Sequence, residues 1–323
     1  DETSLDAINQ LDAFAREHDL VFNIGPVNSR GQESDEFTAW LTEIITKTQR
    51  INCSLIVASE QKGIDHQSIR VSAKIMSAIS RSTLGGEGNF RFTANAFCPP
   101  GSPFFPVAYF NDEAFSIGLE TPDILQQTFE EASGIEDASR NLKRNLELAL
   151  QPVAAQAEKI ANTTSRSYLG IDTSPAPLLD VSIGRAIETL SGVPFGSAST
   201  LSACAAITDV LKSLDLKTCG YSGLMLPILE DTTLAARAME GRYSISDLLL
   251  FSSVCGTGLD VVPLPGDIST DQLAALVGDV ASLAKKYSKP LSARLFPVEG
   301  KKSGDMVTFD HPYLTDSVAM KVE

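Results

Sequence analysis

The chain has 323 residues, of which 43% are hydrophobic and 21% charged, so it can fold around a sizeable core and is not a disordered chain. Its 41 acidic residues outweigh 26 basic ones, and the net charge of −15 argues against nucleic acid or an anionic membrane surface as a partner. No apolar run approaches the roughly 20 residues that span a bilayer. We therefore expect a small-molecule ligand, with no nucleic acid and no membrane as partner.

The cysteines favour a reducing compartment. An odd number without paired spacing argues against a disulfide framework. No secretory signal is visible either, although the chain starts at Asp1 rather than Met. We expect a cytoplasmic protein with reduced thiols. With only three histidines and no CxxC or HxxxH pattern, a zinc site is not expected, and the sequence indicates neither a metal nor a cofactor. The five cysteines are Cys53, Cys98, Cys204, Cys219 and Cys255.

The first half of the chain predicts helices that alternate with short strands. The apolar residues Leu5, Ile8, Leu11 and Phe14 follow helical spacing. The segment 98–106 (CPPGSPFFP) contains four prolines, which fix φ and remove N–H donors, so it cannot be regular structure. The other predicted elements, in order, are strand 20–24, helix 34–49, strand 51–58, helix 64–80, strands 90–97 and 115–119, and helices 122–133 and 136–161.

From Tyr168 onward, short apolar runs end in loops rich in Gly, Pro, Ser and Asp, and helices lie between them. This βα alternation predicts an α/β fold in which the strands form one barrel-like sheet with the helices outside. In such folds the loops at one end of the strands carry the function. The predicted strands are 168–171, 259–262 and 291–296, and the predicted helices are 182–190, 201–214, 232–239, 245–252 and 270–287.

The loop SVCGTGLD, residues 253–260, is the first candidate for chemistry. Cys255 could present a nucleophilic thiol, and Gly256 and Gly258 could offer bare backbone N–H groups to a ligand. A cysteine packed in a tight turn is the alternative. Asp172 follows the predicted strand 168–171, where a catalytic base or a ligand-binding acid commonly lies. The alternative for Asp172 is a turn or a helix cap.

Further polar residues could bind a substrate. Arg294 lies in the alternating run 291–296, and Lys301 lies in a Gly-rich loop, so both could hold a carboxylate or phosphate. The alternatives are a structural salt bridge for Arg294 and a solvated loop for Lys301. Asp260 could contact a ligand or a metal through its carboxylate. The paired acids Glu230 and Asp231 could share a metal or a proton, although such acids more commonly cap a helix.

The stretches IDTSPAP, SVCGTGLDVVPLPGD, RLFPVEGKKSGDMVTF and YSGLMLPILED resemble domain-of-unknown-function family 711. The resemblance is most specific over residues 168–323. It implies a single-domain, ten-stranded α/β barrel like that of the pyruvate formate-lyase-like enzymes, and it implies that an N-terminal segment of the family pattern precedes this chain. In that barrel a cysteine loop reaches the centre, and the Cys255 loop is the candidate. No glycyl-radical segment of the RVxG type is present, so radical catalysis is not expected.

Two functions remain open. The first is an enzyme that acts on a small anionic metabolite, with Cys255 and Asp172 as catalytic residues and with Gly256, Gly258, Asp260, Arg294 and Lys301 binding the substrate. This requires Asp172, Cys255 and Arg294 to face one cavity. The second is a non-catalytic ligand-binding or scaffold protein on an enzyme-like barrel, a homodimer in which apolar side chains such as Phe104, Phe105 and Met225 fill the pocket.

Overall fold

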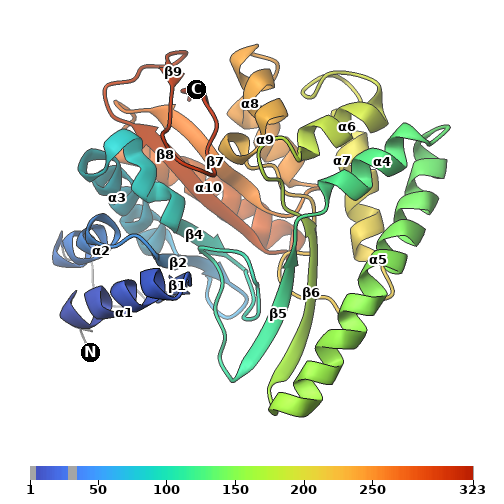
Figure 1. The fold of residues 1–323 in the computed structure, drawn as a ribbon. Helices are drawn as coiled ribbons and strands as arrows, with labels where there is room; N and C mark the ends of the chain where they lie inside the picture. The colour runs from blue at the N-terminus through green and yellow to red at the C-terminus, as the bar shows by residue number, and fades with distance from the viewer. Residues whose placement is uncertain (1–4, 28–34, 323) are drawn as a thin grey trace.

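The computed structural model describes residues 5–27 and 35–322. Its largest sheet has six strands, which lie side by side in the order β1–β2–β4–β8–β7, with β3 paired to β2 (Figure 1). Strands β1, β2 and β4 are parallel, β8 runs antiparallel to β4, and β7 runs parallel to β8. The bounds are β1 (Phe22–Asn23), β2 (Ile51–Ser59), β3 (Gly63–Ile64), β4 (Phe92–Ala96), β7 (Gly258–Pro265) and β8 (Leu291–Val298).

Helices cover one face of this sheet. The helices α2 (Asp35–Lys47), α3 (His66–Ser82) and α10 (Thr270–Tyr287) pack on it and on one another. α1 (Leu5–Glu17) packs outside α2. Buried side chains of α2, α3 and α10 join those of β2, β4, β7 and β8 in one hydrophobic core, and α1 packs through Ile8 in a separate cluster with Ile44 and Ile51. The 3-10 segment η1 (Leu84–Arg91) leads from α3 into β4.

The middle of the chain forms a second, smaller sheet. Its strands β5 (Ala114–Leu119) and β6 (Ser167–Pro175) are parallel, and α5 (Ile135–Thr164) lies along them on the side away from the larger sheet (Figure 1). The shorter helices pack around the ends of both sheets, and β9 (Met306–Val307) pairs with β10 (Ser317–Val318). The remaining bounds are α4 (Pro122–Glu130), α6 (Ile183–Ser191), α7 (Thr200–Lys212), η2 (Ile228–Glu230), α8 (Thr232–Met239) and α9 (Ile245–Ser252).

The α/β class is confirmed, but the strands of the described ranges form three separate sheets and no closed barrel. The predicted strand 168–171 lies in β6, which pairs with β5 instead of joining the larger sheet, so the expectation of one sheet is wrong for these residues. The segment between α7 and η2 shows why. Thr218 makes a single bridge to Ile171 of β6, and Pro227 makes a single bridge to Asp260 of β7. The segment forms no strand between the two sheets, because Pro227 lacks an N–H and Gly220 adopts φ 61°.

Most predicted elements match observed ones within a few residues. Strands β6 and β7 extend farther than expected, so Asp172 lies inside a strand rather than after it. The first residue of the predicted helix 34–49 lies outside the described residues. No helix in 5–27 or 35–322 is long and apolar enough to cross a lipid bilayer.

Candidate functional site

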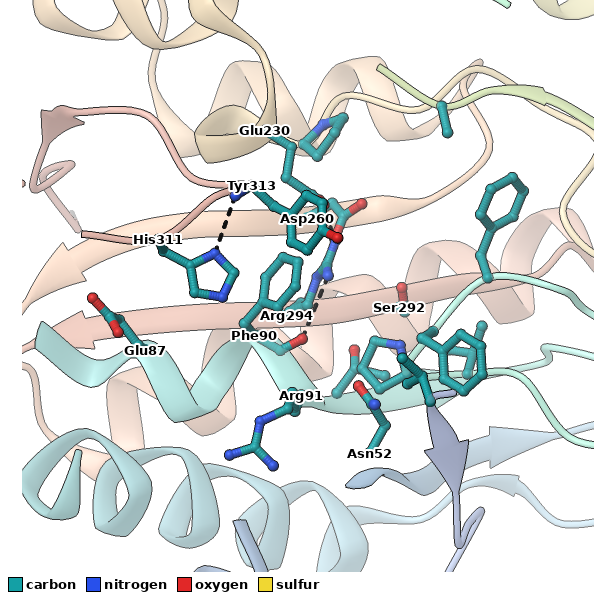
Figure 2. A pocket seen from close by; sticks show the side chains of 18 of the residues that line it. Asn52, Glu87, Phe90, Arg91, Glu230, Asp260, Ser292, Arg294, His311 and Tyr313 are labelled. Carbon is teal, nitrogen blue, oxygen red and sulfur yellow. Dashed lines mark hydrogen bonds and ion pairs between the residues drawn. The ribbon is translucent and has the colours of Figure 1, made fainter. Parts of the chain in front are cut away.

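A cavity of about 1270 Å³ lies against the face of the six-stranded sheet that α2, α3 and α10 leave uncovered. Its walls come from four strands of this sheet and from η1, and the loops 103–107, 225–230 and 310–313 complete them. The ends of β5 and β6 contribute at residues 118–120 and 176–178. Figure 2 shows the polar side chains that point into this space. Segments distant in sequence therefore meet at one site.

The sheet turns a polar face toward the cavity. Along β4 and β8, Phe92, Ala94 and Ala293 point into the helix-covered core, and Thr93, Ser292 and Arg294 alternate with them. Ala94 pairs with Ala293, which sets the polar neighbours of these two residues side by side. The period of two in a strand produces this division.

Arg294 occupies the centre of this face and joins two carboxylates (Figure 2). Its Nε lies 2.7 Å from Asp260 Oδ1, and its Nη2 lies 2.5 Å from Glu230 Oε2. The side chains of Arg294, Asp260 and Glu230 are 8%, 10% and 19% exposed. The guanidinium also lies over the Phe90 ring, 5.0 Å from its centroid. Since a buried charge needs partners, these two acids explain how β8 tolerates an arginine.

Glu230 is poised to exchange a proton near neutral pH. Burial raises the pKa of its carboxyl to about 7, with Arg294 opposing the rise and the negative charge of Asp260 adding to it. Burial lowers the pKa of Arg294, but the two carboxylates outweigh this effect and hold it above its ordinary value. The arginine therefore stays charged, and Glu230 carries the protonation change of the group.

Other titratable groups line the same cavity. Burial lowers the pKa of His311, and the positive charge of Arg91 lowers it further, so the ring is neutral at pH 7. Its Nδ1 accepts a hydrogen bond of 3.3 Å from the Tyr313 backbone (Figure 2). Burial raises the pKa of Glu87, and Asp310 raises it further. Arg91 donates to the carbonyls of Ile45 and Ile51, so it caps the end of α2.

Asp172 does not line the cavity, which corrects the expectation that it faces the site. It is fully buried, and its carboxylate accepts four hydrogen bonds: from the Ser174 N–H and hydroxyl at 3.1 and 2.6 Å, and from the N–H groups of Tyr221 and Ser222 at 2.8 and 2.9 Å. Burial raises its pKa, and these bonds oppose the rise. Asp172 thus fixes the turn that carries Tyr221 into the cavity wall.

Cys255 is also absent from the cavity lining, so the expected convergence of Asp172, Cys255 and Arg294 is wrong. The thiol is completely buried after α9, and burial raises its pKa, which disfavours the nucleophilic thiolate. The carbonyl of Cys255 accepts a hydrogen bond of 2.6 Å from Lys289. This is the packed cysteine that the sequence left open as the alternative.

The neighbouring glycines serve backbone packing. A Cβ on Gly256 would lie 2.6 Å from the Gly223 Cα. Gly258 has φ 91°, and a Cβ there would lie 2.4 Å from the Ser292 carbonyl oxygen. Lys301 lies in the turn after β8, outside the cavity lining, and its carbonyl accepts from Gly266 N–H. Of the expected substrate-binding residues, the cavity therefore brings together Asp260 and Arg294.

The paired acids Glu230 and Asp231 have different roles. Asp231 is the N-cap of α8 and accepts from the N–H groups of Thr233 and Leu234. Glu230 instead lines the cavity. The sequence could not show which of these two adjacent acids is the cap and which faces the cavity. Sequence reasoning missed Asn52, Tyr221 and Ser292. The alternation of polar and apolar residues in 51–55 and 291–296 was the signal that could have identified Asn52 and Ser292.

The described residues contain no group of three or more His, Cys, Asp or Glu side chains arranged to hold a metal ion. All five cysteines are free thiols. The polar groups of the cavity can donate and accept hydrogen bonds, hold an anion at Arg294 and exchange a proton at Glu230.

The fold and cavity define an α/β protein with a buried ion-pair cluster at the open face of its main sheet. Sequence comparison places it more narrowly. Residues 1–310 match the model of the family described as Uncharacterised ACR (DUF711), and the chain belongs to this family. It is 31% identical over 284 residues to a UPF0210 protein of Pyrobaculum aerophilum, and the matched region covers 82% of this chain and 61% of that protein.

Further relatives carry the same printed name. A UPF0210 protein of Pyrobaculum islandicum is 28% identical, with 94% of this chain and 70% of the relative covered. A UPF0210 protein of Bifidobacterium adolescentis is 25% identical, with 83% and 62% covered. The chain spans about three-fifths of the length of the curated relatives that it matches first. The family is uncharacterised, and none of these names states an activity.

Proposed function

We propose that this protein is an enzyme that moves a proton to or from a small anionic metabolite bound in the cavity. The observation that carries this proposal is Glu230. Its carboxyl borders an open cavity, is bonded to Arg294 at 2.5 Å, and has a pKa of about 7. A general acid or base works best when its pKa is near the operating pH, and perturbed carboxyls in clefts are candidates for this role.

Arg294 supports the anionic charge of the substrate. While Glu230 is ionised, the guanidinium faces two carboxylates, Asp260 and Glu230. Once Glu230 is protonated, Asp260 is the anionic partner that Arg294 keeps among these two acids. The guanidinium can then bind a substrate carboxylate in place of the Glu230 charge. The same cavity is also lined by neutral His311 and by further charged or titratable residues: Arg50, Glu87, Arg91, Glu120, Tyr221, Asp310 and Tyr313. Binding of an anion therefore strengthens as the pH falls through about 7.

Cys255 and Asp172 have supporting roles in this proposal instead of the catalytic roles expected first. Asp172 positions Tyr221 through its backbone N–H, and Cys255 packs beneath the loop that leads to Asp260. Gly256 and Gly258 allow that loop to pack closely. Substrate contacts are assigned to Asp260 and Arg294, and Lys301 has no part in them.

The alternative is a non-catalytic protein that binds its ligand at the same cavity. The buried state of Cys255 and Asp172 favours it, because a decayed active site keeps its architecture without a nucleophile. Phe104, Phe105 and Met225 line the cavity and could fill part of it.

A deuterium-exchange screen separates the two functions. The protein is incubated with a library of small carboxylic acids in D₂O, and mass spectrometry detects deuterated or converted compounds. An enzyme converts at least one of them, and Glu230→Gln lowers that rate by about 10²-fold or more. The control Glu240→Gln removes an exposed glutamate that also contacts two arginines, and it leaves the rate unchanged. Saturable binding without exchange or conversion favours the alternative.

Three further expectations belong with this proposal. A single-domain, ten-stranded barrel would need the six-stranded sheet and the β5–β6 sheet to be joined by additional strands, and the greater length of the relatives is compatible with that. The five free thiols support a cytoplasmic location. The homodimer stays a prediction, to be checked by light scattering.

A further inference from the structure

Arg91 carries a positive charge in the cavity wall that no ion pair neutralises. Its Nη1 donates to Thr48 Oγ1 at 3.1 Å and to the Ile51 carbonyl at 2.8 Å, and its Nη2 donates to the Ile45 carbonyl. All of these acceptors are uncharged. Within the described part of the chain Arg91 forms no ion pair. A charge removed from water needs a counter-charge, and a ligand can supply it here.

One edge of the Arg91 guanidinium is open to such a ligand. None of these bonds comes from Nε, which has no partner among the described residues, and Nη2 uses one of its two hydrogens. Nε and Nη2 lie along one edge of the planar group, and paired donors of this kind bind carboxylates and phosphates bidentately. Nε is not sealed from solvent and Arg91 lines the cavity, so an anion can reach this edge.

The acids near Arg91 do not pair with it. Burial lowers the pKa of Arg91, and the negative charge of Asp12 opposes this only in part. The Asp12 carboxylate pairs with Arg16 at 3.1 Å and accepts from two backbone N–H groups of the turn before β2. Glu87 and Asp310 line the same cavity, but burial and the charge of Asp310 raise the pKa of Glu87, so these two acids repel each other.

Arg50 adds a positive charge to the same part of the wall. It precedes Ile51, whose carbonyl Arg91 contacts, and it also lines the cavity. Its Nη2 lies 3.0 Å from Asp19 Oδ1, and the Asp19 side chain is 88% exposed. An exposed ion pair of this kind contributes little to stability, so Arg50 can turn to an anionic ligand.

Strand register places Arg91 within reach of a small molecule bound at Arg294. Ala94 pairs with Ala293 in antiparallel register, so Thr93 lies opposite Arg294. Arg91 comes two residues before Thr93, and at the usual strand spacings the Cα atoms of Arg91 and Arg294 lie about 8 Å apart. Figure 2 shows both arginines among the residues that line the cavity.

We propose that the cavity binds a small dianion, with one carboxylate at Arg294 and a second anionic group, a carboxylate or a phosphate, at Arg91 and Arg50. This inference rests on the proposed function, since it names the substrate class for the same site. It makes Arg91 and Arg50 specificity-determining residues, which distinguish a dianion from a monoanion.

Calorimetric titration at pH 6 compares each dianion with a monoanion of the same carbon chain. The pairs are succinate with butyrate, adipate with hexanoate, and 3-phosphoglycerate with glycerate. At least one dianion is expected to bind about 10-fold tighter than its partner, the value of a hydrogen bond between charged groups. The first two pairs test a second carboxylate, and the third tests a phosphate.

Substitutions of the two arginines locate the second anionic group. Arg91→Gln should weaken the preferred dianion about 10-fold and Arg50→Gln about 3-fold, with the matched monoanion unchanged. Arg140→Gln is the control, because Arg140 also forms one ion pair through Nη2, with Asp137, and lies outside the cavity lining. It leaves both affinities unchanged.

Arg91 also holds the end of α2, so circular dichroism checks that Arg91→Gln is folded. If it is not, Arg50→Gln decides. Equal binding of every dianion and its monoanion, or unchanged affinity for the preferred dianion in the folded variants, would overturn the inference.

The same titrations keep the two proposals apart. If dianions and monoanions bind equally but more tightly at pH 6 than at pH 8, dianion recognition fails and the proton role of Glu230 stands. If a dianion is preferred but binds equally at both pH values, recognition stands and the proton role fails.

Discussion

Arg294 and Glu230, 64 residues apart in the chain, form an ion pair of 2.5 Å at the open face of the main sheet. The strand β8 brings the arginine, and the short segment η2 brings the glutamate. Asp260 on the neighbouring strand β7 completes the cluster at 2.7 Å. The charges of this cluster determine how stability and ligand binding should respond to pH and to substitution of its members.

Substitution of Glu230 by Gln should make the protein less sensitive to pH. Burial raises the pKa of Glu230 from 4.5 to about 7, so the folded state holds the proton more tightly than the unfolded state. The contribution of Glu230 to stability is therefore largest at low pH. It falls by about 1.4 kcal/mol per pH unit as the pH rises from 4.5 to 7.

Urea unfolding at pH 5, 6, 7 and 8 checks this prediction. The stability of Glu230→Gln relative to wild type should rise with pH and level off above 7. Glu240→Gln is the control. Arg242 holds the pKa of Glu240 below its usual value, so this group stays ionised throughout the range. A constant difference between Glu230→Gln and wild type would contradict the prediction.

Substitution of Arg294 by Met should destabilise the fold strongly. It leaves Asp260 and Glu230 buried beside each other without a positive charge, and breaking a buried ion pair costs about 3–5 kcal/mol. Arg237→Met is the matched control, because Arg237 also contacts two glutamates but is 24% exposed. The control should lose about 1 kcal/mol, and equal losses in urea unfolding would argue against a special role for Arg294.

The sequence predicted part of this fold and site. The alternation in 291–296 correctly indicated that Arg294 points inward, and the βα pattern correctly gave the α/β class. The sequence could not pair Arg294 with Glu230, because only the tertiary path of the loop before η2 sets that contact. It also could not decide the role of Cys255, since a cysteine followed by two nearby glycines fits both a nucleophile and a packed turn. The close contact between Gly256 and Gly223, from two segments distant in sequence, shows that the loop is a packed turn.

Asp172 should act on the cavity from a distance. Asp172→Asn places an N–H₂ group against backbone N–H donors and should cost about 3 kcal/mol. The turn that holds Tyr221 would loosen, so affinity for a small carboxylate probe such as gluconate should fall although Asp172 does not touch the cavity. Asp247→Asn, which alters the capping box of α9, should cost about 1 kcal/mol and leave affinity intact. Unchanged affinity in Asp172→Asn would remove its positioning role.

Thiol reactivity should be low in the native protein. Cys219 is the half-buried cysteine, and the other four are buried. Burial raises the pKa of Cys53, Cys98 and Cys219 to about 12 and also raises that of Cys255. A chromogenic disulfide reagent at pH 8 should titrate at most Cys219 before denaturant is added and all five cysteines afterwards. Rapid labelling of Cys255 in the native state would restore it as a candidate nucleophile.

The protonation of Glu230 can be observed directly. The side-chain carboxyls of glutamate are labelled with ¹³C, and the Glu230 signal is assigned by its loss in Glu230→Gln. Its chemical shift is then followed by NMR between pH 4 and 9. A midpoint near pH 7 that moves upward when a small carboxylate such as gluconate is added is the predicted result. A midpoint below pH 5, unaffected by gluconate, would contradict proton exchange at this site.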